Sequence, residues 1–77
     1  MEISSFIENF ANLFDETDFS EFKSETIYKN LPEWSSLIAL SVLAMIDEEY
    51  DVQIKGDDLK NTETIIGLYN IILLRKQ

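Results

Sequence analysis

The chain has 77 residues with neither cysteine nor histidine, and its 15 acidic and 6 basic residues give a net charge of -9 at pH 7. Disulfides, zinc–thiolate sites and a catalytic protein thiol are excluded, and the commonest general base and metal ligand is missing, so we expect no enzyme and no metal site. The negative charge disfavours nucleic acids and anionic membranes as partners and favours proteins with basic patches.

A chain of this length forms one domain, residues 1–77, with a modest core. Hydrophobic residues make up 45% of the sequence, which indicates a folded domain and not a disordered acidic tail. The longest apolar stretch is about half of what a membrane span needs, and the start MEISSFIENF lacks the pattern of a signal peptide. We therefore expect a cytoplasmic monomer without a membrane span.

The first segment has the period of an amphipathic helix, and Ser4 or Ser5 is expected to cap it. The apolar stripe consists of Ile3, Phe6, Ile7, Phe10, Leu13 and Phe14. Residues 15–35 then form a long connection with no clean period and one short turn near Phe19–Lys23. We expect apolar anchors to hold this connection on the core: Phe19, Phe22, Ile27, Tyr28 and Leu31.

The second helix is predicted from Ser36 or Leu37 to about Tyr50, because Pro32 prevents a helix from running through it and Ser35 is a suitable N-cap. Its main apolar stripe is predicted to be Leu37, Leu40, Leu43 and Ile46, widened by Ala39, Val42 and Met45, so that the helix packs on two or more sides. Its acidic end opposes the helix dipole. We therefore expect Asp47, Glu48, Glu49 and Asp51 to dock basic partners.

The last third predicts one short helix and one long one. Val52 and Ile54 alternate like a lone strand, residues 57–60 form one helical turn, and Asp57 and Asp58 are solvated caps, since no calcium-loop pattern surrounds them. Thr62 or Thr64 opens a final helix whose stripe is Ile65, Leu68, Tyr69 and Ile72, with Gly67 marking close packing and Arg75 and Lys76 in its last turn. The fold class is all-α: a bundle of three main helices and one short helix.

One stretch resembles a known family. Trp34-Ser35-Ser36-Leu37, followed by an apolar helix that ends in Asp47-Glu48-Glu49-Tyr50, is similar to the core of acyl carrier proteins, where Asp-Ser-Leu opens the second helix. The later segments VQIKGDDL and TETIIGLYNII resemble the family's third and fourth helices, so the resemblance covers essentially the whole chain.

The resemblance implies an acyl-carrier-like bundle with a covalent 4'-phosphopantetheine arm on Ser36, whose thiol carries acyl groups as thioesters for fatty-acid, polyketide or related specialised synthesis. It implies a phosphopantetheinyl transferase as a partner, together with acyl-processing enzymes that have basic docking patches: a ketosynthase, an acyltransferase or an acyl ligase. Leu37 and Ile38 join the acids as expected docking residues, and the space between the second and later helices is expected to shelter the acyl chain.

The chain departs from the family motif at Ser35, which stands in place of the aspartate and is assigned to helix capping, with modification at Ser35 as a minor alternative. Ile38 and Ser41 occupy positions that are often acidic in the family. Trp34 is either a recognition surface or a buried anchor. Two other functions stay open: a peptidyl or aminoacyl carrier of a non-ribosomal pathway, and an acidic helical adaptor that binds a basic protein.

Overall fold

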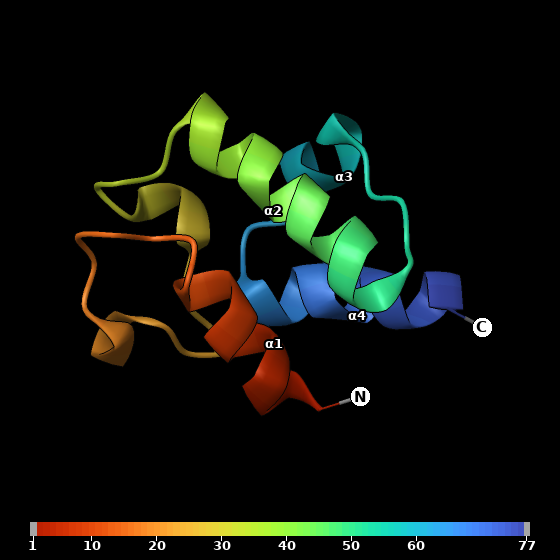
Figure 1. The fold of residues 1–77 in the computed structure, drawn as a ribbon, viewed down its shortest axis with the longest axis horizontal. Coiled ribbons are helices and arrows are strands. Elements are labelled where there is room, and N and C mark those ends of the chain that lie inside the picture. The colour runs from red at the N-terminus through yellow and green to blue at the C-terminus, as the bar shows by residue number, and fades with distance from the viewer. Residues whose placement is uncertain (1, 77) are drawn as a thin grey trace.

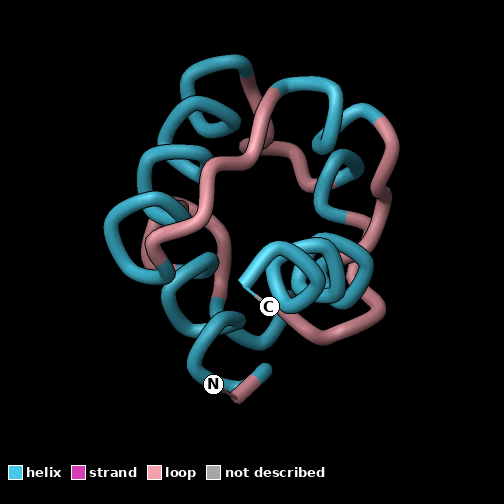
Figure 2. Tube along the Cα trace, turned by 90° about the vertical axis from the view of Figure 1, so that its right-hand side faces the viewer, coloured by secondary structure: helices cyan, strands magenta, loops and turns pink. Residues whose placement is uncertain are grey.

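The computed structural model describes residues 2–76, and over this range the chain forms four α-helices (Figure 1). They are α1 (Ile3–Ala11), α2 (Ser36–Tyr50), α3 (Gly56–Lys60) and α4 (Ile65–Lys76). Single-turn 3-10 helices lie at Phe19–Glu21 and Tyr28–Asn30. Figure 2, viewed nearly along α4, shows only helices and loops in the described chain, and the one isolated bridge pairs Ile27 with Thr64. The predicted all-α fold, with a short third helix and a long connection after the first, is confirmed.

Aromatic side chains from α1 form the centre of the core. Phe6 and Phe10 are fully buried, and the Phe6 ring lies 5.8 Å from that of Tyr50 in α2 and 5.6 Å from that of Tyr69 in α4, measured between centroids. Each such contact adds about 0.5–1.5 kcal/mol to the effect of burial alone. The predicted stripe is thus correct at these positions, and α1 joins α2 to α4.

The ends of α1 differ from the prediction. The helix begins after Glu2, which makes no side-chain cap, and Ser4 and Ser5 lie inside the helix, so the expected serine cap is wrong. The helix also ends at Ala11, before the last two members of the stripe. Phe14 is nevertheless buried, because a turn in which its N–H donates to the Ala11 carbonyl returns its side chain to the core.

The long connection is held on the bundle by two buried side chains and one carboxylate. Phe22 and Tyr28 are buried as expected, whereas Phe19 is 57% exposed and Ile27 is 43% exposed, so these two are not anchors. The Glu33 carboxylate accepts hydrogen bonds from the Asp15 and Glu16 N–H groups and the Thr17 hydroxyl. Glu33 therefore ties the two ends of the connection together.

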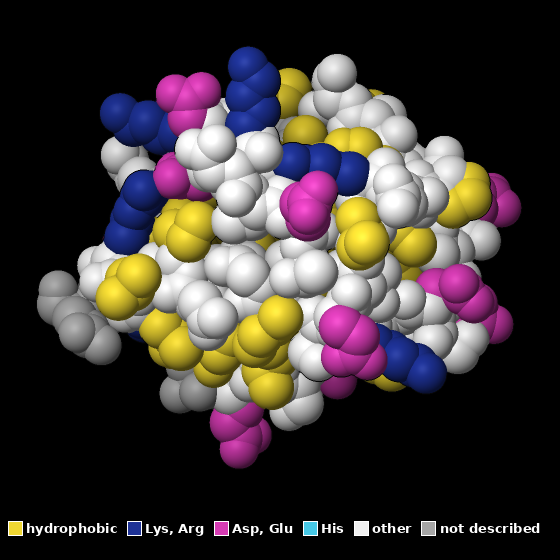
Figure 3. Space-filling model, turned by 180° about the vertical axis from the view of Figure 1, so that it is seen from behind, with side chains coloured by type: hydrophobic (Ala, Val, Ile, Leu, Met, Phe, Trp, Pro, Cys, Tyr) yellow, Lys and Arg dark blue, Asp and Glu magenta, His cyan; other side chains and the backbone are white. Residues whose placement is uncertain are grey.

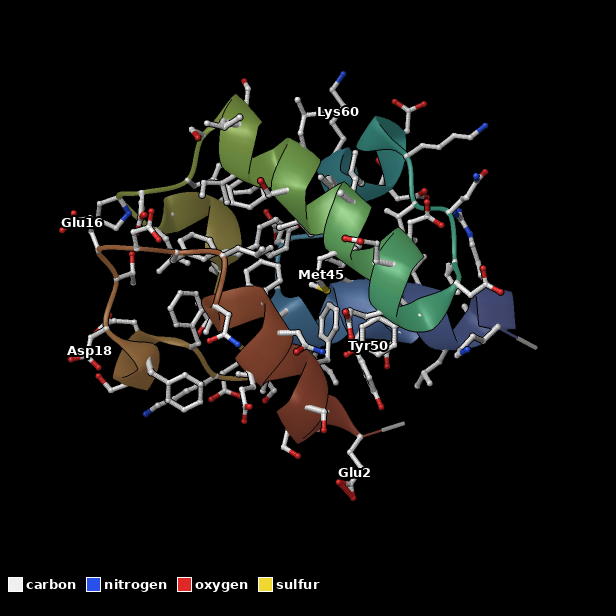
Figure 4. All side chains as sticks on the ribbon, in the orientation of Figure 1. Glu2, Glu16, Asp18, Met45, Tyr50 and Lys60 are labelled. Carbon is white, nitrogen blue, oxygen red and sulfur yellow. The ribbon has the colours of Figure 1, made fainter. Side chains whose placement is uncertain are left out.

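The buried face of α2 agrees with the prediction at Val42, Met45 and Ile46 but not at Leu37 and Leu40. Leu37 and Leu40 are 73% and 63% exposed, whereas Val42 and Ile46 are fully buried. The buried residues of α2 are Val42, Met45, Ile46 and Tyr50, and Figure 4 shows Met45 and Tyr50 pointing into the bundle. Because α2 is apolar almost all round its first three turns, its hydrophobic period does not indicate which face packs.

An ion pair joins α3 to the C-terminal turn of α4. The terminal nitrogens Nη1 and Nη2 of Arg75 donate to the Asp58 carboxylate, at 2.8 and 2.7 Å, and Asp58 also accepts the Lys55 N–H at the start of α3. Asp58 is thus a cap, as expected, and also a partner of Arg75. In α4 the four predicted stripe residues are buried, and the Thr64 hydroxyl caps the helix by accepting the Gly67 N–H.

Two other expectations concern close packing and the segment before α3. A Cβ at Gly67 would lie 3.1 Å from the Thr64 hydroxyl oxygen, which agrees with the close packing expected there. Val52 and Ile54 are both buried, but they lie in a loop, so the predicted lone strand is absent from the described chain.

Candidate functional site

The hydroxyls at the start of α2 have different surroundings. Ser35 is the N-cap, with extended backbone angles, and its Oγ accepts the Ile38 N–H at 3.2 Å, which confirms the predicted cap. Ser41, one turn further, donates to the Leu37 carbonyl. Ser36 is the first helical residue, is exposed, and its hydroxyl makes no hydrogen bond to any described residue. Of these serines, Ser36 alone presents an unengaged hydroxyl to a reactant.

Ser36 lies on a groove between α2 and α3, which we call the α2–α3 groove. The groove has a volume of ≈ 510 Å³, which is in the range of small-molecule sites. The groove is lined by Lys29, Trp34, Ser36, Ala39, Leu40, Leu43, Gly56, Leu59 and Lys60. A hollow of ≈ 260 Å³ adjoins it at Leu43 and is bounded by Ala44, Asp47, Gln53, Ile54 and Lys55. An elongated, mostly apolar ligand could therefore lie along α2.

The expected docking residues form two groups on the outside of α2. Leu37 is exposed at the start of the helix, next to exposed Leu40, whereas Ile38 is half-buried and packs against the core. The acids expected to dock partners are all exposed at the other end: Asp47, Glu48, Glu49 and Asp51. Two exposed leucines followed by a run of carboxylates make a surface that is apolar at one end and anionic at the other.

Asp51 has a structural task as well. It is the C-cap of α2, with φ 55 and ψ 40 in the left-handed region, and its N–H donates to the Asp47 carbonyl. Aspartate tolerates this conformation better than most residues other than glycine. Asp51 therefore ends the helix and leaves its carboxylate on the surface, so the charge and the backbone turn can be tested separately.

A buried hydroxyl network supports the floor of the groove. The Tyr28 hydroxyl lies 3.1 Å from the carbonyls of Leu59 and Thr62 and 2.7 Å from the Thr62 hydroxyl. Burial raises the pKa of Tyr28, although its hydrogen bond with Thr62 opposes the shift, so the phenol stays neutral. Trp34 packs on the Tyr28 ring at 4.9 Å and also lines the groove. The structure thus supports the anchoring role of Trp34 and gives it a surface on the groove.

The resemblance implies a space between α2 and the later helices, but the residues of α3 that line it, Gly56, Leu59 and Lys60, are not among the residues expected from the sequence. The Asp58–Arg75 pair fixes α3 against α4, and its hydrogen bonds with Arg75 lower the pKa of Asp58. Lys29 and Lys60 were not among the candidate site residues either. In the structure, the Lys29 ammonium donates a hydrogen bond to the Lys60 carbonyl at 3.1 Å. The residues are 31 positions apart, so only the fold brings them together.

Comparisons of the chain with protein-family models, with curated proteins and with solved structures give no match. Within residues 2–76, no helix has the length and apolar character needed to cross a membrane. The same residues contain no group of three or more acidic side chains arranged to hold a metal ion.

Proposed function

We propose that the protein is an acyl carrier protein that bears a 4'-phosphopantetheine arm on Ser36. The observation that carries the proposal is the Ser36 hydroxyl, which is exposed and unengaged at the first turn of α2 while the hydroxyls of Ser35 and Ser41 are used within the helix. A phosphodiester at this place would be favoured by the free N–H groups of the first turn and by the helix dipole. The arm would supply the thiol that the chain itself lacks.

The surroundings of Ser36 support the same proposal. Ser36 lines the α2–α3 groove, whose other side chains are mainly apolar, and this suits an acyl chain attached to Ser36. The exposed acids at the C-terminal end of α2 would steer enzymes with basic patches toward the arm. A flexible tether then presents its cargo to each docked enzyme at a high effective concentration.

The proposal is tested by intact mass after co-expression with a broad-specificity phosphopantetheinyl transferase. We expect the wild-type chain to gain one phosphopantetheine, Ser35→Ala to gain it too, and Ser36→Ala to gain none. A wild-type chain that gains no mass, or a gain that survives Ser36→Ala, overturns the assignment. Ser35→Ala is the matched control because it removes the neighbouring hydroxyl.

A second candidate function, an acidic adaptor without an arm, is favoured by the exposure of Leu37 and Leu40 beside the acids of α2. Native protein that carries no arm, and that binds one basic protein stoichiometrically through a salt-sensitive contact, would support it. For a carrier, the cargo distinguishes an acyl from a peptidyl or aminoacyl role. Loading of the holo protein by an acyl ligase supports the former, and loading by an amino-acid-adenylating enzyme supports the latter.

A further inference from the structure

The α2–α3 groove and its adjoining hollow are locally cationic in an otherwise strongly acidic protein. Three of the chain's 6 basic residues line them, Lys29, Lys55 and Lys60, whereas Asp47 is the one acidic residue among the described residues that does so. Figure 3 shows Lys and Arg side chains gathered toward the upper edge of the rear face, next to exposed hydrophobic side chains. The groove is thus locally positive although the chain has a net charge of -9, and this suggests that the lysines have a role at the groove.

The lysines lie at different places along the groove. Lys55 faces the end bounded by Ala44 and Asp47, whereas Lys29 and Lys60 line the part that includes Ser36 and Trp34. Figure 4 shows the Lys60 side chain projecting from α3 at the upper edge of the molecule. Lys29 and Lys60 therefore line the same part of the groove as Ser36, and the Lys60 side chain extends from its rim.

Lys29 is held in place. Its ammonium donates one hydrogen bond to the Lys60 carbonyl at 3.1 Å and lies 5.8 Å from the centre of the Tyr28 ring. A lysine ammonium has three donors, so others remain for a ligand. The contact to the Lys60 carbonyl also fixes the Lys29 ammonium against the end of α3, in the part of the groove that Lys60 also lines.

We infer that Lys29 and Lys60 form a phosphate clamp, which binds the phosphodiester of a chain attached to Ser36 and turns that chain into the α2–α3 groove. The inference rests on the proposed function and deepens it, because it assigns positioning residues to the arm. Phosphate carries the negative charge that the lysines complement, and the apolar lining between them accepts the chain that follows. Release of the phosphate by salt or by a docking enzyme would swing the arm out.

The test uses the arm's thiol, which is the protein's sole thiol because the chain has no cysteine. Holo protein is prepared as wild type, as Lys29→Gln/Lys60→Gln, and as the charge-matched control Lys23→Gln/Lys76→Gln, and its rate of alkylation by neutral iodoacetamide is measured. Two exposed ion pairs to the phosphate should shift the arm toward the groove, and so shield its thiol, by about threefold to tenfold. We therefore expect the double groove variant to react faster by that factor and the control to react like wild type. Added salt should speed the wild type and the control, which keep both lysines, but not the groove variant.

The fluorescence of Trp34 provides a second measurement, since this residue lines the groove. We expect arm attachment to change Trp34 fluorescence in the wild type and to change it less in the groove variant. Equal alkylation rates in wild type and groove variant overturn the clamp while leaving the carrier function intact, as does an equal acceleration in the control. A wild-type chain that accepts no arm overturns the carrier function and the clamp together. Circular dichroism melting of each variant verifies that the proteins compared are folded.

Discussion

The adjacent serines at the start of α2 are expected to respond to alanine with opposite signs. Ser35 supplies the oxygen that accepts the Ile38 N–H, and losing such a cap typically costs about 0.5–2 kcal/mol. The bond is exposed and 3.2 Å long, so water can replace part of it, and we expect Ser35→Ala to lose about 0.5–1 kcal/mol, the lower part of that range. For a domain of this size the melting temperature should fall by about 2–8 °C.

Ser36→Ala should not destabilise the fold. Its hydroxyl has no hydrogen-bond partner among the described residues, and alanine has a higher helix propensity than serine by up to about 0.5 kcal/mol. The melting temperature of Ser36→Ala should therefore equal or exceed that of the wild type. Ser35→Asp, which restores the acid of the resembled motif, keeps an acceptor and adds a charge that suits the helix N-terminus, so its stability should match or exceed the wild type.

The assay is thermal and urea denaturation of the apo variants, followed by intact mass after treatment with the transferase. Stability should fall in Ser35→Ala alone, and loading should fail in Ser36→Ala alone. A loss of stability in Ser36→Ala as large as in Ser35→Ala would refute the reasoning, because it would mean that the Ser36 hydroxyl is engaged in the fold. An unchanged Ser35→Ala would equally show that the cap contributes nothing.

Three further predictions concern the bundle that supports the site. Asp58→Asn removes the carboxylate paired with Arg75, whose hydrogen bonds lower the pKa of Asp58 in the folded state. The contribution of the carboxylate to stability is therefore complete above the ordinary aspartate pKa of about 4 and is lost as the pH falls through the folded-state pKa. The urea midpoints of variant and wild type should differ at pH 7 and converge in acid. Leu40→Ala should cost less than about 0.5 kcal/mol and Ile46→Ala about 2–5 kcal/mol in urea denaturation, and similar costs would contradict the observed face of α2. Asp51→Gly should keep or raise the melting temperature, by up to about 1 kcal/mol in stability, because glycine adopts the left-handed C-cap freely; a marked loss would assign the stability to the carboxylate.

The contrast between α1 and α2 shows which parts of the fold are predictable from the sequence. In α1, exposed Glu2 and Glu8 mark the solvent side, so the apolar period identifies Phe6 and Phe10 as core. In α2 the helix bounds and the Ser35 cap follow from local chemistry, but apolar residues occur on every side of the first three turns. Which of them pack is decided by the position of α1, and the local sequence contains no information about that.

The site divides in the same way. Ser36 and the acids of α2 could be named as candidate site residues from the sequence, because their predicted roles depend only on their positions along one helix. The resemblance implies a space between α2 and the later helices, but the lysines that line it are not predictable from the sequence, because Lys29 and Lys60 are brought together by a contact between residues 31 positions apart. The Asp58–Arg75 pair joins residues 17 positions apart for the same reason. Each of these depends on how the long connection and α4 return to α2 and α3.

The two proposed functions require the same properties of most of α2 and differ only in what they require of Ser36. A carrier and an adaptor both need an accessible face, so the exposure of Leu37 and Leu40 suits either. Only the carrier needs a free hydroxyl at Ser36, and we expect its replacement by alanine to leave the fold and the rest of the face unchanged. Ser36→Ala therefore separates them: an adaptor keeps its partner at full affinity, whereas a carrier can still dock its enzymes but delivers no cargo. A substitution in the first turn of α2 therefore distinguishes the two functions, whereas substitutions of the acids at its C-terminal end do not.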